Sequence, residues 1–207
     1  MSQILVHTAC LPPISYMAAV VRSEKVYVEG WETYPKQTNR NHCHIYGPNG
    51  RQKLTIPVSR PDGNHTRTRD IVISDHEPWQ RTHWRSIETA YSNSPFFLFY
   101  SDEIRAFFEK PERFLLDYNT KCLVSILKIL NLKIEITHTE AFVNITKDIP
   151  DLRSHSIFSP KPEIFPRYIQ TFEPVHGFIP NLSILDAIFN LGPGTLSYLN
   201  GINFGEH

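Results

Sequence analysis

The first 34 residues switch between two hydrophobic patterns, and this switching limits the possible folds more than any other feature of the chain. Residues 3–7 (QILVH) are a short apolar run typical of a buried strand, and residues 12–21 (PPISYMAAVV) have the proline-rich entry and apolar stripe of a short helix. Residues 25–34 (KVYVEGWETY) then alternate between apolar and polar, which indicates a second strand. Strand, helix and strand within about 30 residues have the length of one βαβ unit.

A β-hairpin is predicted next, over residues 43–58 (CHIYGPNGRQKLTIPV). Two alternating runs flank the GPNG sequence, and the Asn49-Gly50 pair supplies the positive φ that a tight turn needs. Residues 68–74 (TRDIVIS) and 133–139 (KIEITHT) have the composition of two further strands.

Helices are predicted over about residues 78–91, 102–109 and 111–131, where apolar residues recur at helical spacing. The C-terminal part is different, because six prolines between residues 149 and 180 disfavour long regular elements. An irregular wrap over the core is expected there, followed by a short helix over residues 184–190 and a helical turn or two near residues 195–199.

These elements together predict an α+β fold: a mixed β-sheet from the N-terminal half, helices packed on it, and a Pro-rich C-terminal wrap. The alternative is a three-layer α/β arrangement, in which the later strands join the first two in parallel. The chain has 207 residues, so we expect residues 1–207 to form a single domain, with or without a small C-terminal lobe from about residue 149.

Composition excludes several classes of protein. Hydrophobic residues make up 41% of the chain and charged residues 20%, which excludes a disordered or fibrous protein. No apolar run approaches the roughly 18 residues of a membrane span, and the N-terminus lacks a signal-peptide pattern, so we expect a cytoplasmic protein without a membrane span. The three cysteines are widely spaced and form no C-x-x-C pair, which predicts free thiols in a reducing compartment.

The formal net charge is zero, but residues 33–69 hold seven Lys or Arg and a single acid. In this basic segment Lys36 offers a point charge and Arg40 a planar fork, so together they could hold a diphosphate or a carboxylate. The Thr38 hydroxyl and the Asn41 amide could add hydrogen bonds. The alternative is a solvated loop whose cations merely face water.

Two further residues could take part in chemistry. His83 lies in the apolar stripe of its helix, where a histidine is either a hydrogen-bonded core residue or, with an unperturbed pKa of about 6.5, a general base. Asp186 comes three residues after Ser183, which matches a helix capping box, and a site role is the alternative.

Other common sites receive no support. His42, Cys43 and His44 are of zinc-ligand type, but alternation along a strand places Cys43 on the face opposite the two histidines, so no metal site is expected. The chain has no glycine-rich phosphate loop, no G-x-S-x-G elbow and no H-E-x-x-H motif. The common nucleotide-binding, serine-hydrolase and zinc-protease templates therefore do not apply.

Four blocks of sequence are together specific enough to indicate a family. The chain resembles the WbqC-like protein family, in the form found in Bacteroidetes, from residue 5 to about residue 199. The blocks, in the family's order, are HTACLPPISY, VYVEGWETYPKQTNRNHCHIYGPNG with LTIPV, EPWQRTHWRSIETAYSNSPFF and GFIPNLSILDAIFNLGP.

This resemblance implies a cytoplasmic enzyme that modifies a sugar precursor. The family is found with O-antigen and other surface-polysaccharide genes, and a glycine-transferase role has been suggested for some members. The chain departs from the family at Thr8, Ala9 and Cys10, where many members have Gln-Pro followed by aromatics, and at His42, where an arginine is common. The recurrent positions of the family that coincide with the candidates are Lys36, Arg40, Asn41, Trp79, His83, Tyr91, Ser183, Asp186 and Asn190.

We therefore expect an aminoacyl (glycine-type) or acyl transferase that acts on a phosphorylated amino sugar, either nucleotide-activated or lipid-linked. In this hypothesis Lys36 and Arg40 bind phosphate, His83 is the base, and either Asp186 or Glu32 orients the amine. The remaining substrate contacts would come from Thr38, Asn41, Tyr91 and Asn190.

Two other classes of function remain open at this point. One is a non-catalytic binding protein for a phosphorylated ligand or a nucleic acid, although the neutral net charge disfavours nucleic acid. The other is a scaffold within a polysaccharide assembly complex. The sequence identifies neither a cofactor nor the acyl donor.

Overall fold

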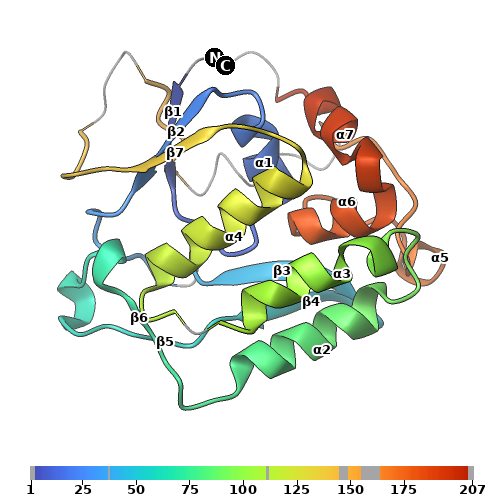
Figure 1. Ribbon diagram of the computed structural model, residues 1–207, viewed down its shortest axis with the longest axis horizontal. Coiled ribbons are helices and arrows are strands. Elements are labelled where there is room, and N and C mark those ends of the chain that lie inside the picture. The colour runs from blue at the N-terminus through green and yellow to red at the C-terminus, as the bar shows by residue number, and fades with distance from the viewer. Residues whose placement is uncertain (1–2, 37, 111, 145–148, 155–163, 205–207) are drawn as a thin grey trace.

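A three-stranded parallel sheet forms the N-terminal layer (Figure 1). Its strands β1 (Gln3–His7), β2 (Lys25–Glu29) and β7 (Glu135–His138) lie in the order β1-β2-β7, and α1 (Ile14–Val20) connects the first two. The predicted βαβ unit is confirmed, because β1 and β2 pair in parallel from Gln3 opposite Lys25.

The computed structural model describes residues 3–36, 38–110, 112–144, 149–154 and 164–204. Within the described ranges, residues 150–152 extend the sheet beyond β1. The Leu5 amide donates to the Pro150 carbonyl at 3.0 Å, and the Leu152 amide donates to the Leu5 carbonyl at 2.8 Å. A C-terminal segment therefore runs parallel to the first strand of the chain.

The predicted hairpin is also confirmed. It consists of β3 (His42–Gly47) and β4 (Gly50–Thr55), which pair antiparallel, with Gly50 at a φ of +94°. A second, short antiparallel pair is formed by β5 (Val58–Ser59) and β6 (Val72–Ile73). The α+β class is thus confirmed, and the parallel and antiparallel strands lie in separate sheets.

Helices cover these sheets (Figure 1). The predicted helix at 78–91 is α2 (Trp79–Tyr91), the second is α3 (Phe97–Arg105), which begins earlier than expected, and the third is α4 (Leu115–Ile129). Position 111, where the third helix was expected to begin, lies outside the described residues. Among the described residues, short 3₁₀ helices cover Gly63–His65, Thr68–Asp70, Ala106–Phe108 and Gly192–Gly194.

The C-terminal helices are α5 (Glu173–His176), α6 (Ile184–Leu191) and α7 (Thr195–Gly201). They pack onto the N-terminal part, where the Ile14 amide donates to the Leu182 carbonyl at 2.9 Å. Pro160 and Pro162 of the expected proline-rich wrap lie outside the described residues. None of the helices among the described residues is long and apolar enough to cross a membrane.

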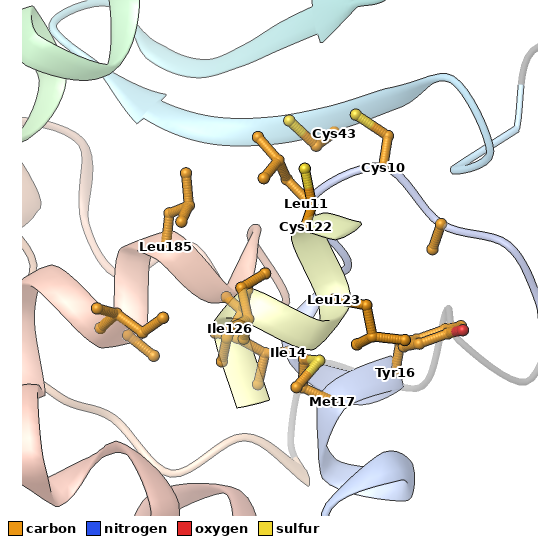
Figure 2. Close-up of a cluster of buried hydrophobic side chains, with 14 of the residues drawn as sticks. Cys10, Leu11, Ile14, Tyr16, Met17, Cys43, Cys122, Leu123, Ile126 and Leu185 are labelled. Atoms are coloured by element: carbon orange, nitrogen blue, oxygen red, sulfur yellow. The ribbon is translucent and has the colours of Figure 1, made fainter. Parts of the chain in front are cut away.

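The core lies where α1, α4 and α6 converge with β3, and it contains three thiols (Figure 2). Cys10, Cys43 and Cys122 are free and buried, and their sulfur atoms face one another across this core. Burial raises the pKa of Cys122 to about 12, so its thiol stays protonated at neutral pH.

Candidate active site

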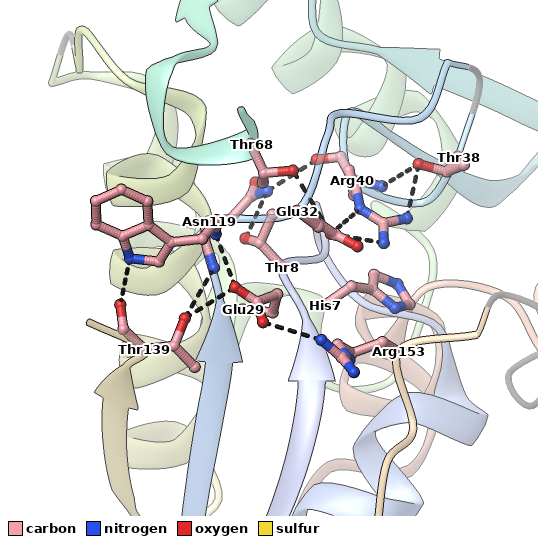
Figure 3. Close-up of polar contacts among 12 residues, drawn as sticks. His7, Thr8, Glu29, Glu32, Thr38, Arg40, Thr68, Asn119, Thr139 and Arg153 are labelled. Atoms are coloured by element: carbon pink, nitrogen blue, oxygen red, sulfur yellow. Dashed lines mark hydrogen bonds and ion pairs between the residues drawn. The ribbon is translucent and has the colours of Figure 1, made fainter. Parts of the chain in front are cut away.

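Polar side chains gather where the parallel strands end (Figure 3). β1 ends at His7, β2 at Glu29 and β7 at His138, so the carboxyl ends of all three lie at one edge of the sheet. In open sheets with parallel strands, ligands bind outside this edge. The fold therefore favours the carboxyl edge as the place for a ligand.

An ion pair between Glu32 and Arg40 lies just beyond this edge. Both Nε and Nη2 of Arg40 lie 2.7 Å from Glu32 Oε1, and Nη1 donates to Thr38 Oγ1 at 3.2 Å. The Arg40 side chain is 3% exposed and the Glu32 side chain 16%, so the carboxylate is the more accessible half of the pair. Buried ion pairs need such additional hydrogen bonds to offset the loss of water.

Asn119 of α4 fixes the backbone of the Arg40 loop. Its Nδ2 donates to the Arg40 carbonyl at 2.8 Å and to Thr8 Oγ1 at 3.1 Å, and all three residues are buried (Figure 3). Because Thr8 directly follows β1, one side chain joins the end of β1 to the loop that holds the arginine. Tyr34 lies close to Arg40 as well, and its buried hydroxyl makes no hydrogen bond with the described residues.

A second polar network centres on Glu29, the last residue of β2. Its Oε1 accepts from the Trp31 amide at 2.7 Å and from Thr139 Oγ1 at 2.9 Å, and its Oε2 accepts from Arg153 Nη1 at 3.0 Å and from the Val143 amide at 3.1 Å. Four donors saturate this fully buried carboxylate, so its role is to position its neighbours.

Arg153 connects Glu29 to residues 150–152, which run beside β1. Its Nε and Nη2 lie 2.9 and 2.6 Å from the two oxygens of Asp151, the fork geometry that an arginine makes with a carboxylate. Hydrogen bonds from Arg153 lower the pKa of Asp151 below its ordinary value, because they stabilise the ionised form. Residues 150–152 are thereby held beside β1 through side chains as well as backbone.

The structure brings together Glu32, Thr38 and Arg40, three of the residues selected from the sequence. Lys36 is exposed in the loop between Glu32 and Arg40. Asn41 is half-buried, and its Nδ2 donates to the Ile56 carbonyl at 3.1 Å, a contact that fixes the loop to β4's continuation. Its second amide atom, Oδ1, is buried and makes no hydrogen bond with the described residues.

His83 lies on the inner face of α2, away from this group of contacts. Its Nε2 lies 3.2 Å from the Thr55 carbonyl, and its ring packs edge-on against Trp79 at 5.1 Å and Phe108 at 6.3 Å. Burial lowers the pKa of His83 to about 4, so the imidazole is neutral at pH 7. No hydrogen bond among the described residues joins His83 to Glu32 or Arg40.

Asp186 belongs to a third polar group, which it forms with Tyr168 and Gln170. Its Oδ2 accepts from the Tyr168 hydroxyl and, at 2.8 Å, from Gln170 Nε2. Burial raises the pKa of Asp186 to about 6, and the hydrogen bonds from Tyr168, Gln170 and Tyr91 oppose that rise. The predicted capping role belongs to Ser183, whose Oγ accepts from the Leu185 amide at 3.4 Å.

Tyr91 and Asn190 also contact this third group. The Tyr91 hydroxyl accepts from the Tyr46 amide at 3.1 Å, and Asn190 Nδ2 donates to the Asp186 carbonyl at 2.8 Å. The first contact holds α2 to β3, and the second lies within α6. Tyr91, Asp186 and Asn190 therefore share one region, separate from the contacts of Glu32 and Arg40.

On β3 the two histidines share one face, as the alternation predicts. Their rings meet edge-on with centroids 5.4 Å apart, while Cys43 points into the core (Figure 2). Among the described residues, no group of three His, Cys, Asp or Glu side chains is arranged to hold a metal ion.

Sequence reasoning missed three residues of the carboxyl edge: Glu29, Asn119 and Arg153. Glu29 carried a usable signal, because an acid at the end of a buried strand of a βαβ unit is placed at the ligand-binding edge. Asn119 and Arg153 carried none, since each acts on a residue at least 79 positions away along the chain.

Comparison with known proteins gives two matches. The model of the WbqC-like protein family matches residues 8–155. A protein of Mycobacterium tuberculosis (strain ATCC 25618 / H37Rv) named Uncharacterized protein Rv1507c is 26% identical, with 80% of this chain and 83% of that protein covered. No solved structure matches. The family match spans Glu29, Glu32, Arg40, Asn119 and Arg153, whereas Asp186 and Asn190 lie beyond it.

Proposed function

This chain belongs to the WbqC-like protein family, and we propose that it is an aminoacyl (glycine-type) or acyl transferase acting on an amino-sugar precursor of a surface polysaccharide. The sugar is phosphorylated or nucleotide-linked, and the reaction takes place in the cytoplasm, where such activated precursors are made. The site is the carboxyl edge of the parallel sheet.

The observation that carries this proposal is the Glu32–Arg40 ion pair at that edge. Arg40 approaches Glu32 only through Oε1, and Oε2 makes no hydrogen bond with the described residues. A carboxylate fixed through one oxygen can hold a substrate amine with the other. The surrounding contacts to Thr38, Thr68 and Asn119 keep the pair from rotating.

The chemistry follows from this arrangement. The sugar amine attacks the acyl carbon of a thioester or aminoacyl ester, an N–C bond forms, and the bond from carbon to sulfur or oxygen breaks. The amine proton passes to a base, and the leaving thiol or alcohol takes up a proton. Glu32 orients the amine and is positioned to accept its proton, while Lys36 is free to approach a phosphate.

His83 as the base and Asp186 as the orienting group stay predictions. Neither has a described hydrogen bond to Glu32 or Arg40, and each has a structural partner of its own in Thr55 or Tyr168. If they act in catalysis, they act from outside the contacts that surround the ion pair.

The test is acyl transfer from a glycyl or acetyl thioester to a nucleotide-linked sugar with a free amine, followed by mass spectrometry. Glu32→Gln keeps an oxygen for Arg40 but removes the negative charge and the proton acceptor, so turnover is measured per folded molecule, with the folded fraction taken from urea unfolding. We expect the turnover of the folded fraction to fall about a hundredfold or more. The matched control is Glu24→Gln, an exposed acid at the opposite end of β2, which should leave turnover unchanged. The proposal is contradicted if Glu32→Gln turns over like the wild type. It is also contradicted if the wild-type protein transfers neither acyl group to the amino sugar.

A binding protein without chemistry is the second candidate. The observation that favours it is the saturation of Glu29 by four donors, which leaves Glu32 as the less engaged of the two acids at the carboxyl end of β2. Binding of a nucleotide sugar without transfer, under conditions where several acyl donors are supplied, would support this candidate.

A further inference from the structure

Trp31, Arg67 and Arg69 form a cluster on the outer face of the chain segments that rise from the carboxyl edge. We call these three residues the Trp31 cluster. The guanidinium carbon of Arg69 lies 4.2 Å from the centre of the Trp31 ring, and that of Arg67 lies 5.5 Å from it. Such contacts hold a guanidinium group flat against an aromatic face.

Backbone pairing explains why both arginines face the same way. Residues 30–34 run antiparallel to residues 66–69, with the Thr68 amide donating to the Glu32 carbonyl at 3.0 Å and the Arg69 amide donating to the Gly30 carbonyl at 2.9 Å. In this arrangement Thr68 is fully buried, whereas Arg67 and Arg69 are exposed. The inward side of the same segment contacts Glu32.

The indole of Trp31 is itself fixed. Its Nε1 donates to the Thr139 carbonyl at 2.9 Å, and its backbone amide donates to the buried Glu29 carboxylate at 2.7 Å. Trp31 is thus attached to the ends of β2 and β7, and it offers a rigid platform for the two arginines. A rigid platform reduces the entropy that an arginine loses when it binds an anion.

Most of the N–H donors of these two arginines make no hydrogen bond with the described part of the chain. Arg67 donates one hydrogen bond, from Nη1 to the Trp31 carbonyl at 2.8 Å, and has no carboxylate partner among the described residues. Arg69 has Asp70 at 3.6 Å, and both of these side chains are 46% exposed, so water screens that pair. Arg40, in contrast, already spends its guanidinium on Glu32 and Thr38.

We propose that the Trp31 cluster is a binding site for a diphosphate, the anionic part of a nucleotide-linked or lipid-linked sugar. The two guanidinium forks bind the phosphate oxygens, and Trp31 keeps the forks in place. The assignment of a sugar diphosphate rests on the proposed function, whereas the anion site itself rests on the geometry of the cluster. It also gives the basic segment a function at residues that the sequence did not single out.

Calorimetric titration with UDP and with inorganic pyrophosphate tests this proposal, with uridine as the uncharged comparison. We expect both anions to bind the wild-type protein, uridine to bind much more weakly, and the affinities to fall as salt is raised. Arg67→Met with Arg69→Met should raise the Kd of both anions about tenfold for each guanidinium lost. Arg81→Met, an exposed arginine on α2, is the matched control and should leave the Kd unchanged.

Three results would overturn the site. One is a Kd that is equal in the double variant and the wild type. Another is a wild-type protein that binds neither anion. The third is a short single-stranded oligonucleotide that binds more tightly than UDP and loses its affinity in the double variant, since the ligand is then a nucleic acid.

The same variants separate this inference from the proposed function. If the double variant loses anion binding and the wild type shows no acyl transfer, the anion site is supported and the transferase proposal is contradicted. If the double variant transfers an acyl group to a nucleotide-linked amino sugar with an unchanged KM, the anion site is contradicted and the transferase proposal is supported.

Discussion

At the scale of single residues, Lys36 and Arg40 differ although they lie four positions apart in one basic segment. Arg40 is 3% exposed and has Glu32 as its counterion, while Lys36 is exposed. Removing one partner of a buried pair leaves the other charge without compensation, which typically costs about 3–5 kcal/mol. Loss of binding in an Arg40 variant would therefore mix with loss of folding, whereas a Lys36 variant reports on ligand contact alone.

His83 is the residue where a structural and a catalytic role predict different outcomes. His83→Gln removes a ring that packs against Trp79 and Phe108 and disturbs the hydrogen bond to Thr55, so we expect a loss of about 1–3 kcal/mol in unfolding free energy. A general base would instead contribute about a hundredfold to ten-thousandfold to turnover. Its buried environment, and its pKa of about 4, favour the structural outcome.

The measurement is a urea titration at neutral pH beside the turnover of the folded fraction. Gln80→Ala, on the neighbouring and more accessible face of α2, serves as the control for changes in that helix. A variant that unfolds at the wild-type urea concentration but turns over a hundredfold more slowly would establish His83 as the base.

At the scale of elements, local patterns could be predicted and partners distant in the chain could not. The βαβ unit and the β3–β4 hairpin depend on periodicity and turn residues within about 30 positions, so the sequence was sufficient for both. Among the described strands, β3 and β4 form a two-stranded sheet apart from the parallel one. The same limit applies to the site: Thr38 and Arg40 are near Glu32 in sequence, while Glu29 and Arg153 meet across 124 positions.

The junction between α6 and α7 depends on a glycine. Gly192 has a φ of +53° and a ψ of −122°, and a Cβ there would lie 2.5 Å from the ring of Phe96. We expect Gly192→Ala to lower the unfolding free energy by roughly 2–4 kcal/mol, because strain and overlap act together. Thermal and urea unfolding measure this loss.

Gly201→Ala is the matched control for that junction. Gly201 ends α7, and a Cβ there would meet no heavy atom within 4 Å, so the change should stay within about 0.5 kcal/mol. Equal stability of the two variants would mean that the α6–α7 junction adapts to a side chain.

At the scale of the whole molecule, buried and half-buried groups that lie far apart make stability depend on pH in opposite directions. Burial lowers the pKa of both His83 and His44 to about 4, so the unfolded chain gains protons below pH 6.5 that the folded chain does not, and stability falls as the pH falls. Burial raises the pKa of Asp186 to about 6, so the unfolded chain loses a proton above its ordinary pKa of 3.8 while the folded chain keeps it. Stability therefore falls as the pH rises through that range.

Asp186→Asn separates these opposing contributions. An asparagine cannot ionise, and its oxygen can still accept from Tyr168 and Gln170, so residues 168–170 stay attached to α6. A shift from 3.8 to about 6 corresponds to about 3 kcal/mol, which is fully present below pH 3.8 and lost by the time the pH exceeds about 6. In urea titrations between about pH 4 and pH 7, the wild-type protein should therefore lose stability relative to the variant as the pH rises.

Asp75→Asn, at an exposed position before α2, is the control, and its unfolding free energy plotted against pH should run parallel to that of the wild type. If the Asp186→Asn profile runs parallel to it as well, Asp186 ionises in the folded protein as it does in the unfolded chain, and its burial does not control the pH dependence.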